Sequence, residues 1–216
     1  MKSTPILLAL TATCALNAAA HADLFYTFDT DAQGWTSIND TSFHGWDGTL
    51  GNPDTGALRG VDRASGAIWY NAAPVADLGD LSGLYTNAIS YDILGINGSQ
   101  SGLSDRADII LSGAAMDIGI NISTQPVNGQ WTSWSALVDD TAGWEILSST
   151  SSGTLSGTLV NAAQIQAVLS DVQGLYIRGE YTNGGDSSAI DNVRIAPAPG
   201  TLALLGLGAL AARRRR

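Results

Sequence analysis

The 216-residue chain has few of the side chains on which enzymes and metal sites usually depend. It contains one cysteine, Cys14, and two histidines, His21 and His44. A single cysteine has no partner within the chain for a disulfide. A catalytic triad needs a base beside its nucleophile, most often histidine, and a zinc site needs several nitrogen or sulfur donors. The composition therefore argues against both kinds of site and favours a packing or surface role for His44.

Basic residues are also scarce away from the chain ends. Between residues 23 and 195, five arginines stand against all 20 acidic residues, which gives this segment a formal net charge of −15. A segment with this much negative charge repels the phosphate backbones of nucleic acids. Binding to nucleic acid without regard to sequence is therefore excluded.

The first 22 residues have the three parts of a secretory signal peptide. Lys2 precedes an apolar run from Ile6 to Leu16, and small residues then lead to Ala20-His21-Ala22. The apolar run is too short to cross a bilayer, which takes about 20 residues. A buried helix is the alternative interpretation. We predict export, with cleavage after Ala22 and loss of Cys14.

The last 21 residues, 196–216, combine a proline pair, an apolar segment and an arginine cluster. The residues that define this pattern are Pro197, Pro199, Gly200, Arg213, Arg214, Arg215 and Arg216. In this order they resemble the PEP-CTERM sorting signal of Gram-negative bacteria, although Ala198 stands where that family has glutamate. The resemblance implies an exosortase-type processing enzyme as a partner. It also implies transient anchoring in the inner membrane through a C-terminal apolar helix, and final display at the cell surface. A simple tail anchor is the alternative.

The segment between these ends has the composition of an all-β domain. It holds 22 of the 25 glycines and 18 aspartates but only two glutamates, which favours turns over helices. Apolar residues alternate with polar ones at Ile89, Tyr91 and Ile93, and again in 116–122 and 175–181, as in half-buried strands. These patterns predict a β-sandwich or barrel.

One stretch of this segment has helical rather than strand periodicity. Ile165, Val168, Leu169 and Val172 would share one side of a short helix, with Asn161 as its N-cap and Gly174 as its end. Serine and threonine crowd residues 148–158, which we predict to be a flexible surface loop.

Several blocks of residues 23–195 resemble the laminin B domain, also called laminin IV type A. These blocks are WYNAAPVADLGDLSGLYTNAISYDIL (69–94), ADIILSG (107–113), WTSWS (131–135), GW (143–144) and QAVLSDVQGLYIRGEYTNGGDSSAIDNVRI (166–195). The resemblance implies a jelly-roll-like β-sandwich that is extracellular and has no chemistry of its own. The expected organisation is a signal peptide (1–22), a laminin B-like domain (23–195) and a sorting segment (196–216).

The acidic residues at the two ends of this domain suggest a structural calcium ion. Asp29 and Asp31 open the domain, and Asp191 lies in Ile190-Asp191-Asn192-Val193 near its end. The layout resembles carbohydrate-binding jelly rolls that share a calcium between such segments, and first and last strands often pair. Calcium prefers oxygen ligands of this kind. An Asx turn that needs no metal is the alternative.

The six tryptophans raise the question of sugar binding, because exposed aromatic rings stack on pyranose faces. Trp35, Trp131 and Trp144 fall in blocks that match the family and are predicted to lie in the core. Trp46 stands between Gly45 and Asp47-Gly48, and it is the candidate for an exposed ring that contacts a ligand.

These observations predict an exported, surface-retained, non-enzymatic β-sandwich protein. Its role would be adhesion, or association with extracellular matrix or exopolysaccharide. The alternative is a dedicated carbohydrate-binding module. A glycoside-active enzyme with paired carboxylates is a third interpretation. With 18 aspartates in the chain, some pair always lies within reach, so composition gives that enzyme no specific support.

Overall fold

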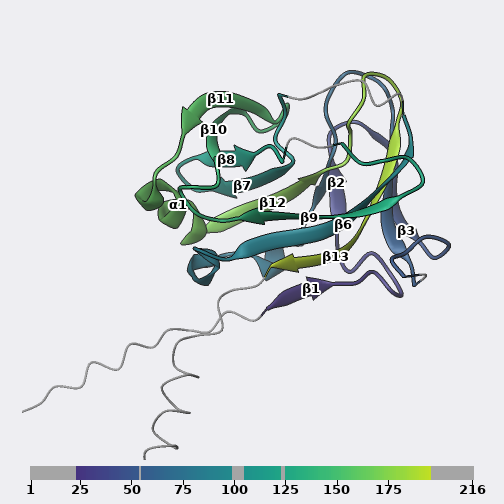
Figure 1. The fold of residues 1–216 in the computed structure, drawn as a ribbon, viewed down its shortest axis with the longest axis horizontal. Helices are drawn as coiled ribbons and strands as arrows, with labels where there is room; N and C mark the ends of the chain where they lie inside the picture. Colours follow the sequence, from purple (N-terminus) through teal and green to yellow (C-terminus); the bar gives the residue numbers. More distant parts are fainter. Residues whose placement is uncertain (1–22, 54, 99–104, 123–124, 196–216) are drawn as a thin grey trace, which may run out of the picture.

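The computed structural model describes residues 23–53, 55–98, 105–122 and 125–195, which form two antiparallel sheets packed face to face (Figure 1). Sheet A has the order β3-β4-β13-β6-β9, with β1 also paired to β13. Its strands are β1 (Leu24–Tyr26), β3 (Thr41–Asp47), β4 (Ala57–Asp62), β6 (Ala88–Asn97), β9 (Trp131–Leu137) and β13 (Ser187–Ile195). The predicted class, an all-β jelly-roll-like sandwich with one short α-helix, is confirmed.

Sheet B has the order β11-β10-β8-β7-β12-β5-β2. Its strands are β2 (Thr36–Ile38), β5 (Tyr70–Ala72), β7 (Ile109–Gly113), β8 (Asp117–Ile120), β10 (Glu145–Ser149), β11 (Thr154–Leu159) and β12 (Val172–Arg178). Two short 3-10 helices, Val75–Asp77 and Ser82–Leu84, and the helix α1 (Ala162–Leu169) complete the described elements.

The hydrophobic core lies between the two sheets and follows the alternation read from the sequence. In β6, Ile89, Tyr91 and Ile93 point inward and are at most 1% exposed, while Ser90 and Asp92 face outward. Burying an aliphatic side chain of this size contributes about 2 kcal/mol. This term, repeated over many strands, holds the sheets together.

The helix begins where the sequence predicts and ends earlier. Asn161 caps α1 and Gln164 reaches back to the Asn161 N–H, which forms a complete capping box. The helix stops at Leu169, with Ser170 as its C-cap, so the predicted end at Gly174 is wrong. Val172 already pairs with Gly79 in extended conformation, and this pairing overrides the helical spacing.

The predicted surface loop at residues 148–158 is instead part of a β-hairpin. Strands β10 and β11 pair through Leu147 opposite Leu155, and Gly153 makes the turn with a φ of +61°. Glycine adopts this left-handed conformation without steric cost. Threonine favours strands, so the serine- and threonine-rich composition indicated the wrong state here.

The first and last described strands lie side by side, as the sequence predicted. Leu24 of β1 is opposite Ile195 of β13, and Asp23 forms an ion pair with Arg194 at 2.6 Å. The nine residues of β13 carry the chain about 27 Å to its other end at Ser187. Both ends of the domain therefore lie at one end of the sandwich.

The predictions for residues 1–22 and 196–216 lie outside the described residues. These are the signal peptide cleaved after Ala22, and the sorting segment with its apolar helix. Within the described ranges, every helix is too short or too polar to cross a membrane.

Candidate functional site

The predicted calcium ligands Asp29 and Asp31 lie in the exposed turn after β1. The Thr27 hydroxyl donates to Asp29 Oδ2 at 2.8 Å, and the Gln33 N–H donates to Asp31 Oδ1 at 2.7 Å. The second contact is an Asx turn, the metal-free alternative for Asp31. Asp31 therefore stabilises its own turn.

Asp191 lies in β13 and is only 1% exposed. The N–H groups of Asn52 and Asn192 each donate to its carboxylate at 2.7 Å. Burial above all, together with the nearby charges of Asp92 and Asp29, raises the pKa of Asp191 to about 6. Asp191 is thus a buried carboxylate held by two backbone donors.

All three predicted calcium ligands, Asp29, Asp31 and Asp191, accept hydrogen bonds from protein groups. In the described part of the chain, no group of three or more His, Cys, Asp or Glu side chains is arranged to hold a metal ion. The crowding of carboxylates around Asp191 is still an environment that a cation would relieve. Calcium at Asp29, Asp31 and Asp191 stays a prediction.

A polar network that the sequence analysis missed holds residues 48–53 against the outer face of sheet A. Asn52 Nδ2 and Asn192 Nδ2 both donate to Asp92 Oδ2, at 3.0 and 2.8 Å. Asn192 Nδ2 also donates to the Asn52 carbonyl oxygen at 2.7 Å. Beside this network, Leu50 packs against Ala57, Leu94 and Ala189. The loop is therefore a fixed part of the outer face.

Trp46 lies on the edge strand β3 and is 42% exposed, as the sequence analysis predicted. Its Nε1–H donates to the Phe28 carbonyl oxygen at 2.7 Å. Its ring lies so close to Gly48 and Gly56 that a Cβ at either position would come within 2.6 Å of it. The indole is thus fixed in place while much of it stays open to solvent.

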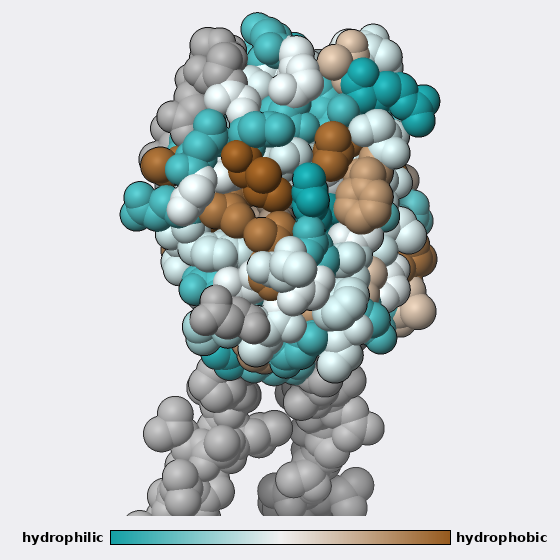
Figure 2. All heavy atoms as spheres, turned by 90° about the vertical axis from the view of Figure 1, so that its right-hand side faces the viewer, coloured by the Kyte–Doolittle hydropathy of each residue, from teal (hydrophilic) through white to brown (hydrophobic). Residues whose placement is uncertain are grey.

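A second aromatic side chain of β3 is exposed, three residues before Trp46 and therefore on the opposite face of the strand. Phe43, also on β3, is 47% exposed. Seen from the side on which β3 lies, hydrophobic residues gather in a patch surrounded by hydrophilic ones (Figure 2). Contiguous exposed hydrophobic surface of this kind often marks an interaction site.

The remaining sequence-predicted aromatic and histidine positions are mostly confirmed. Trp35 and Trp144 lie in the core at 3% and 1% exposure. Trp131 was also predicted to be a core residue, but it lies partly exposed beside Leu94 on the outer face of sheet A. His44 Nε2 contacts Asn71 Oδ1 at 3.0 Å in a half-buried packing position, and burial lowers the pKa of its imidazole.

An open cavity of about 360 Å³ lies at the end of the sandwich away from Leu24 and Ile195. We call it the acidic cavity because Asp62 and Glu180 line it. The other residues of its wall are Ala64, Gly66, Ala67, Ile68, Arg106, Ser151, Ser152, Asn183 and Gly184. They come from loops far apart in the sequence, so no local motif indicated the cavity.

The carboxylates in and near the acidic cavity raise one another's pKa. Burial above all, together with the charges of Asp62 and Asp186, raises the pKa of Glu180 to about 7. The pKa of Asp186 rises to about 6, again mainly through burial. Burial, followed by the Asp40 charge, also raises the pKa of Asp62. Several carboxylates of the same sign of charge therefore lie close together here, and burial removes part of the water that would otherwise stabilise their ionised forms.

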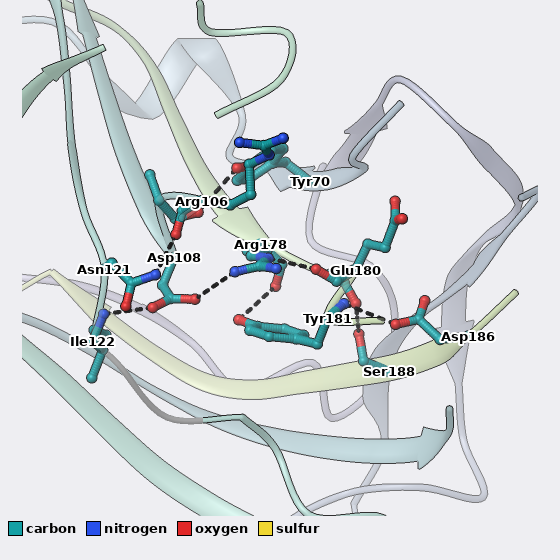
Figure 3. Close-up of polar contacts among 12 residues, drawn as sticks. Tyr70, Arg106, Asp108, Asn121, Ile122, Arg178, Glu180, Tyr181, Asp186 and Ser188 are labelled. Atoms are coloured by element: carbon teal, nitrogen blue, oxygen red, sulfur yellow. Dashed lines mark hydrogen bonds and ion pairs between the residues drawn. The ribbon is translucent and has the colours of Figure 1, made fainter. Parts of the chain in front are cut away.

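A buried ion pair lies beside the acidic cavity and fixes its wall. Arg178 Nη1 lies 3.5 Å from Asp108 Oδ1, and both side chains are at most 2% exposed. Arg178 Nε donates to the Glu180 carbonyl oxygen at 2.5 Å, and the guanidinium lies 4.5 Å from the centre of the Tyr181 ring. Figure 3 shows the Glu180 carboxylate pointing away from this guanidinium. Arg178 therefore fixes the backbone of Glu180, while the carboxylate of Glu180 points away from the ion pair.

Comparison with known proteins identifies the family. The sequence model of Laminin B (Domain IV) matches residues 70–203. The chain belongs to the Laminin B (Domain IV) family. A search of curated proteins found no match.

Solved structures that are similar to this chain include another laminin domain and two carbohydrate-binding modules. The L4b domain of human laminin alpha-2 is similar with a TM-score of 0.53 and 18% identity, over 65% of this chain and 80% of that one. The family 11 carbohydrate-binding module of the Clostridium thermocellum cellulase Lic26A-Cel5E has a TM-score of 0.49 and 15% identity, over 83% and 97%. The xylan-binding CBM22-1 domain of Paenibacillus barcinonensis Xyn10C has a TM-score of 0.48 and 13% identity, over 79% and 90%.

Proposed function

We propose that this laminin B domain is a non-enzymatic binding module, exported and retained at the cell surface, that associates with extracellular matrix or exopolysaccharide. The observation that supports this most directly is the Trp46 indole, fixed by the Phe28 carbonyl yet 42% exposed. A ring that is already immobilised loses little entropy when a ligand packs on it. An exposed aromatic ring that is already held in place is therefore suited to a module that binds a ligand without changing it chemically.

The described side chains favour binding over catalysis. His44, the histidine in this part of the chain, contacts the Asn71 amide and the edge of the Trp69 ring. For His44 to activate a nucleophile, a hydroxyl or thiol group would have to lie beside its imidazole Nε2, where the Asn71 amide lies instead. A glycosidase needs two suitably spaced carboxylates, and Glu180 and Asp62 line the same cavity.

The arrangement of the chain ends supports display. Leu24 and Ile195 lie side by side, so an anchor that follows residue 195 would hold the sandwich by one end. The acidic cavity lies near Ser187, at the opposite end of β13. Retention through the proposed sorting segment, processed by an exosortase-type enzyme, would turn the cavity outward. The proposed setting is the envelope of a Gram-negative bacterium.

A carbohydrate-binding module is the second candidate function, and the exposed Trp46 favours it specifically. We expect the full chain to bind a subset of polysaccharides on a glycan array, and Trp46→Ala to lower this binding at least tenfold. Phe25→Ala is the matched control, because Phe25 is 53% exposed but lies on β1 beside the chain ends.

Three results would contradict parts of this proposal. Binding that is equal in the Trp46 and Phe25 variants would remove Trp46 from the binding surface. A chain that binds no glycan but still adheres to matrix protein would leave adhesion as the function. Release of reducing sugar that disappears in Glu180→Gln would show an enzyme.

A further inference from the structure

The acidic cavity has the dimensions of a ligand site. Its volume of about 360 Å³ falls in the range of small-molecule pockets, which is roughly 300–1,000 Å³. Polar groups surround it, among them the hydroxyls of Ser151 and Ser152 and the amide of Asn183. A cavity of this size with convergent polar groups is typical of a small-molecule site, and the hydroxyl and amide groups suit a ligand that carries hydroxyls.

Glu180 carries an unused hydrogen-bonding position in this cavity. It is 6% exposed, and the Trp69 N–H, at 3.3 Å from Oε2, is the donor that the described residues supply to its carboxylate. Each carboxylate oxygen can accept more than one hydrogen bond. A ligand with N–H donors would occupy the remaining acceptor positions of this carboxylate.

Asp62 makes the same region more negative. It is 7% exposed, and its Oδ1 accepts from the Ala64 N–H at 2.8 Å, while no donor in the described ranges reaches its buried Oδ2. Its charge lies close enough to disfavour the ionised form of Glu180. Arg106 also lines the cavity, but its Nη1 is 2.5 Å from the Asp105 carboxylate. A ligand with a positive charge would therefore gain from both carboxylates.

An organic cation fits this geometry better than a metal ion. No group of three or more His, Cys, Asp or Glu side chains in the described ranges is placed to hold a metal. The volume also exceeds what a bare ion fills, and it leaves room for an organic ligand beside the hydroxyl and amide groups of the wall.

We infer that the acidic cavity binds a protonated amino sugar, with the ammonium group on the Glu180 carboxylate beside Asp62 and the ring hydroxyls facing Ser151, Ser152 and Asn183. This inference rests on the proposed function, because it names the class of saccharide that the module takes. It uses a different part of the surface from Trp46, so the two can fail separately.

The test is calorimetric titration of the full chain at pH 7 with glucosamine, N-acetylglucosamine and calcium chloride. We expect glucosamine to bind at least tenfold more tightly than N-acetylglucosamine, because acetylation removes the ammonium charge. Glu180→Gln should abolish this preference, and Asp62→Asn should weaken it. Asp171→Asn is the matched control, because Asp171 is exposed and lies outside the cavity wall.

A steric variant keeps the test valid if removing a buried carboxylate alters folding. Ser151→Trp places a large side chain at an exposed position of the cavity wall and should abolish glucosamine binding without changing the melting temperature. Equal affinity for the two sugars, no affinity for either, or calcium binding that Glu180→Gln abolishes would overturn the inference. Trp46-dependent binding to glycans without amino groups, together with no glucosamine binding, would overturn the inference and leave the proposed function standing.

Discussion

Replacing Arg178 by methionine tests whether the buried ion pair stabilises the sandwich. The substitution keeps an elongated side chain but removes the guanidinium beside Asp108, where both groups are at most 2% exposed. It also removes the donor to the Glu180 carbonyl oxygen. Breaking a buried pair by removing one partner costs about 3–5 kcal/mol, because the other charge stays buried without compensation.

This loss is large against a total stability of about 5–15 kcal/mol. For a domain of this size it corresponds to a fall in melting temperature of about 6–20 °C. Urea unfolding and thermal melts followed by circular dichroism at pH 7.5 measure both quantities. Arg194→Met is the control: its ion pair with Asp23 is about half exposed, and such pairs contribute about 0–1 kcal/mol.

The pH dependence of the Arg178→Met loss separates an electrostatic cause from a packing defect. Burial raises the pKa of Asp108 from 3.8 to about 6, and Arg178 is the main group that opposes this rise. Without Arg178 the pKa rises further, so the native state holds a proton on Asp108 more tightly than the unfolded chain does. The variant should therefore regain stability as the pH falls from 7.5 to 5. A loss below 1 kcal/mol at pH 7.5, or an equal loss at both pH values, would refute this reasoning.

Three further predictions concern the metal, the glycine contacts and the carboxylates. If Asp29 and Asp191 hold calcium, EDTA should lower the melting temperature of the wild-type chain and leave that of Asp191→Asn unchanged; a wild-type midpoint that does not respond to EDTA would count against the ion. Gly179→Ala should cost about 1–3 kcal/mol in urea unfolding, since its Cβ would lie 2.0 Å from the Trp69 ring. Gly185→Ala, whose Cβ would meet nothing within 4 Å, should change little. Because burial first, and neighbouring charge second, raise the pKa of Glu180 to about 7, stability should fall as the pH rises from 5 to 8. Asp62→Asn should flatten this trend in thermal melts, and a stability that increases with pH would contradict it.

The fold was largely predictable because burial in this domain is periodic along the chain. Ile89, Tyr91 and Ile93 alternate strictly, and a strand with one face in a core has no other stable arrangement. The capping box at Asn161 is equally local, since it involves residues three apart. Errors occurred where a partner distant in sequence decided the conformation. Val172 has a helical spacing, yet its pairing with Gly79 makes it a strand residue.

The candidate sites were less predictable because distant segments build them. Trp46 could be identified, since its glycine and aspartate neighbours indicated a turn-like, open environment. Glu180 was visible only as a residue of a predicted strand, and nothing near it in sequence indicates that Asp62 lies close by. The network around Asp92 likewise joins residues 40 and 100 positions away. Single-sequence periodicity contains no information on such contacts.

The position of β13 has a mechanical consequence. Strands β4 and β6 flank it in the interior of sheet A, and β1 covers its last residues. A force applied at Ile195 acts along this strand, while the hydrogen bonds to its neighbours are perpendicular to it. The force is then shared by many bonds in shear and does not open them one at a time. A module tethered by its C-terminal end would therefore resist drag from flow or from a moving surface far better than one held by an edge strand.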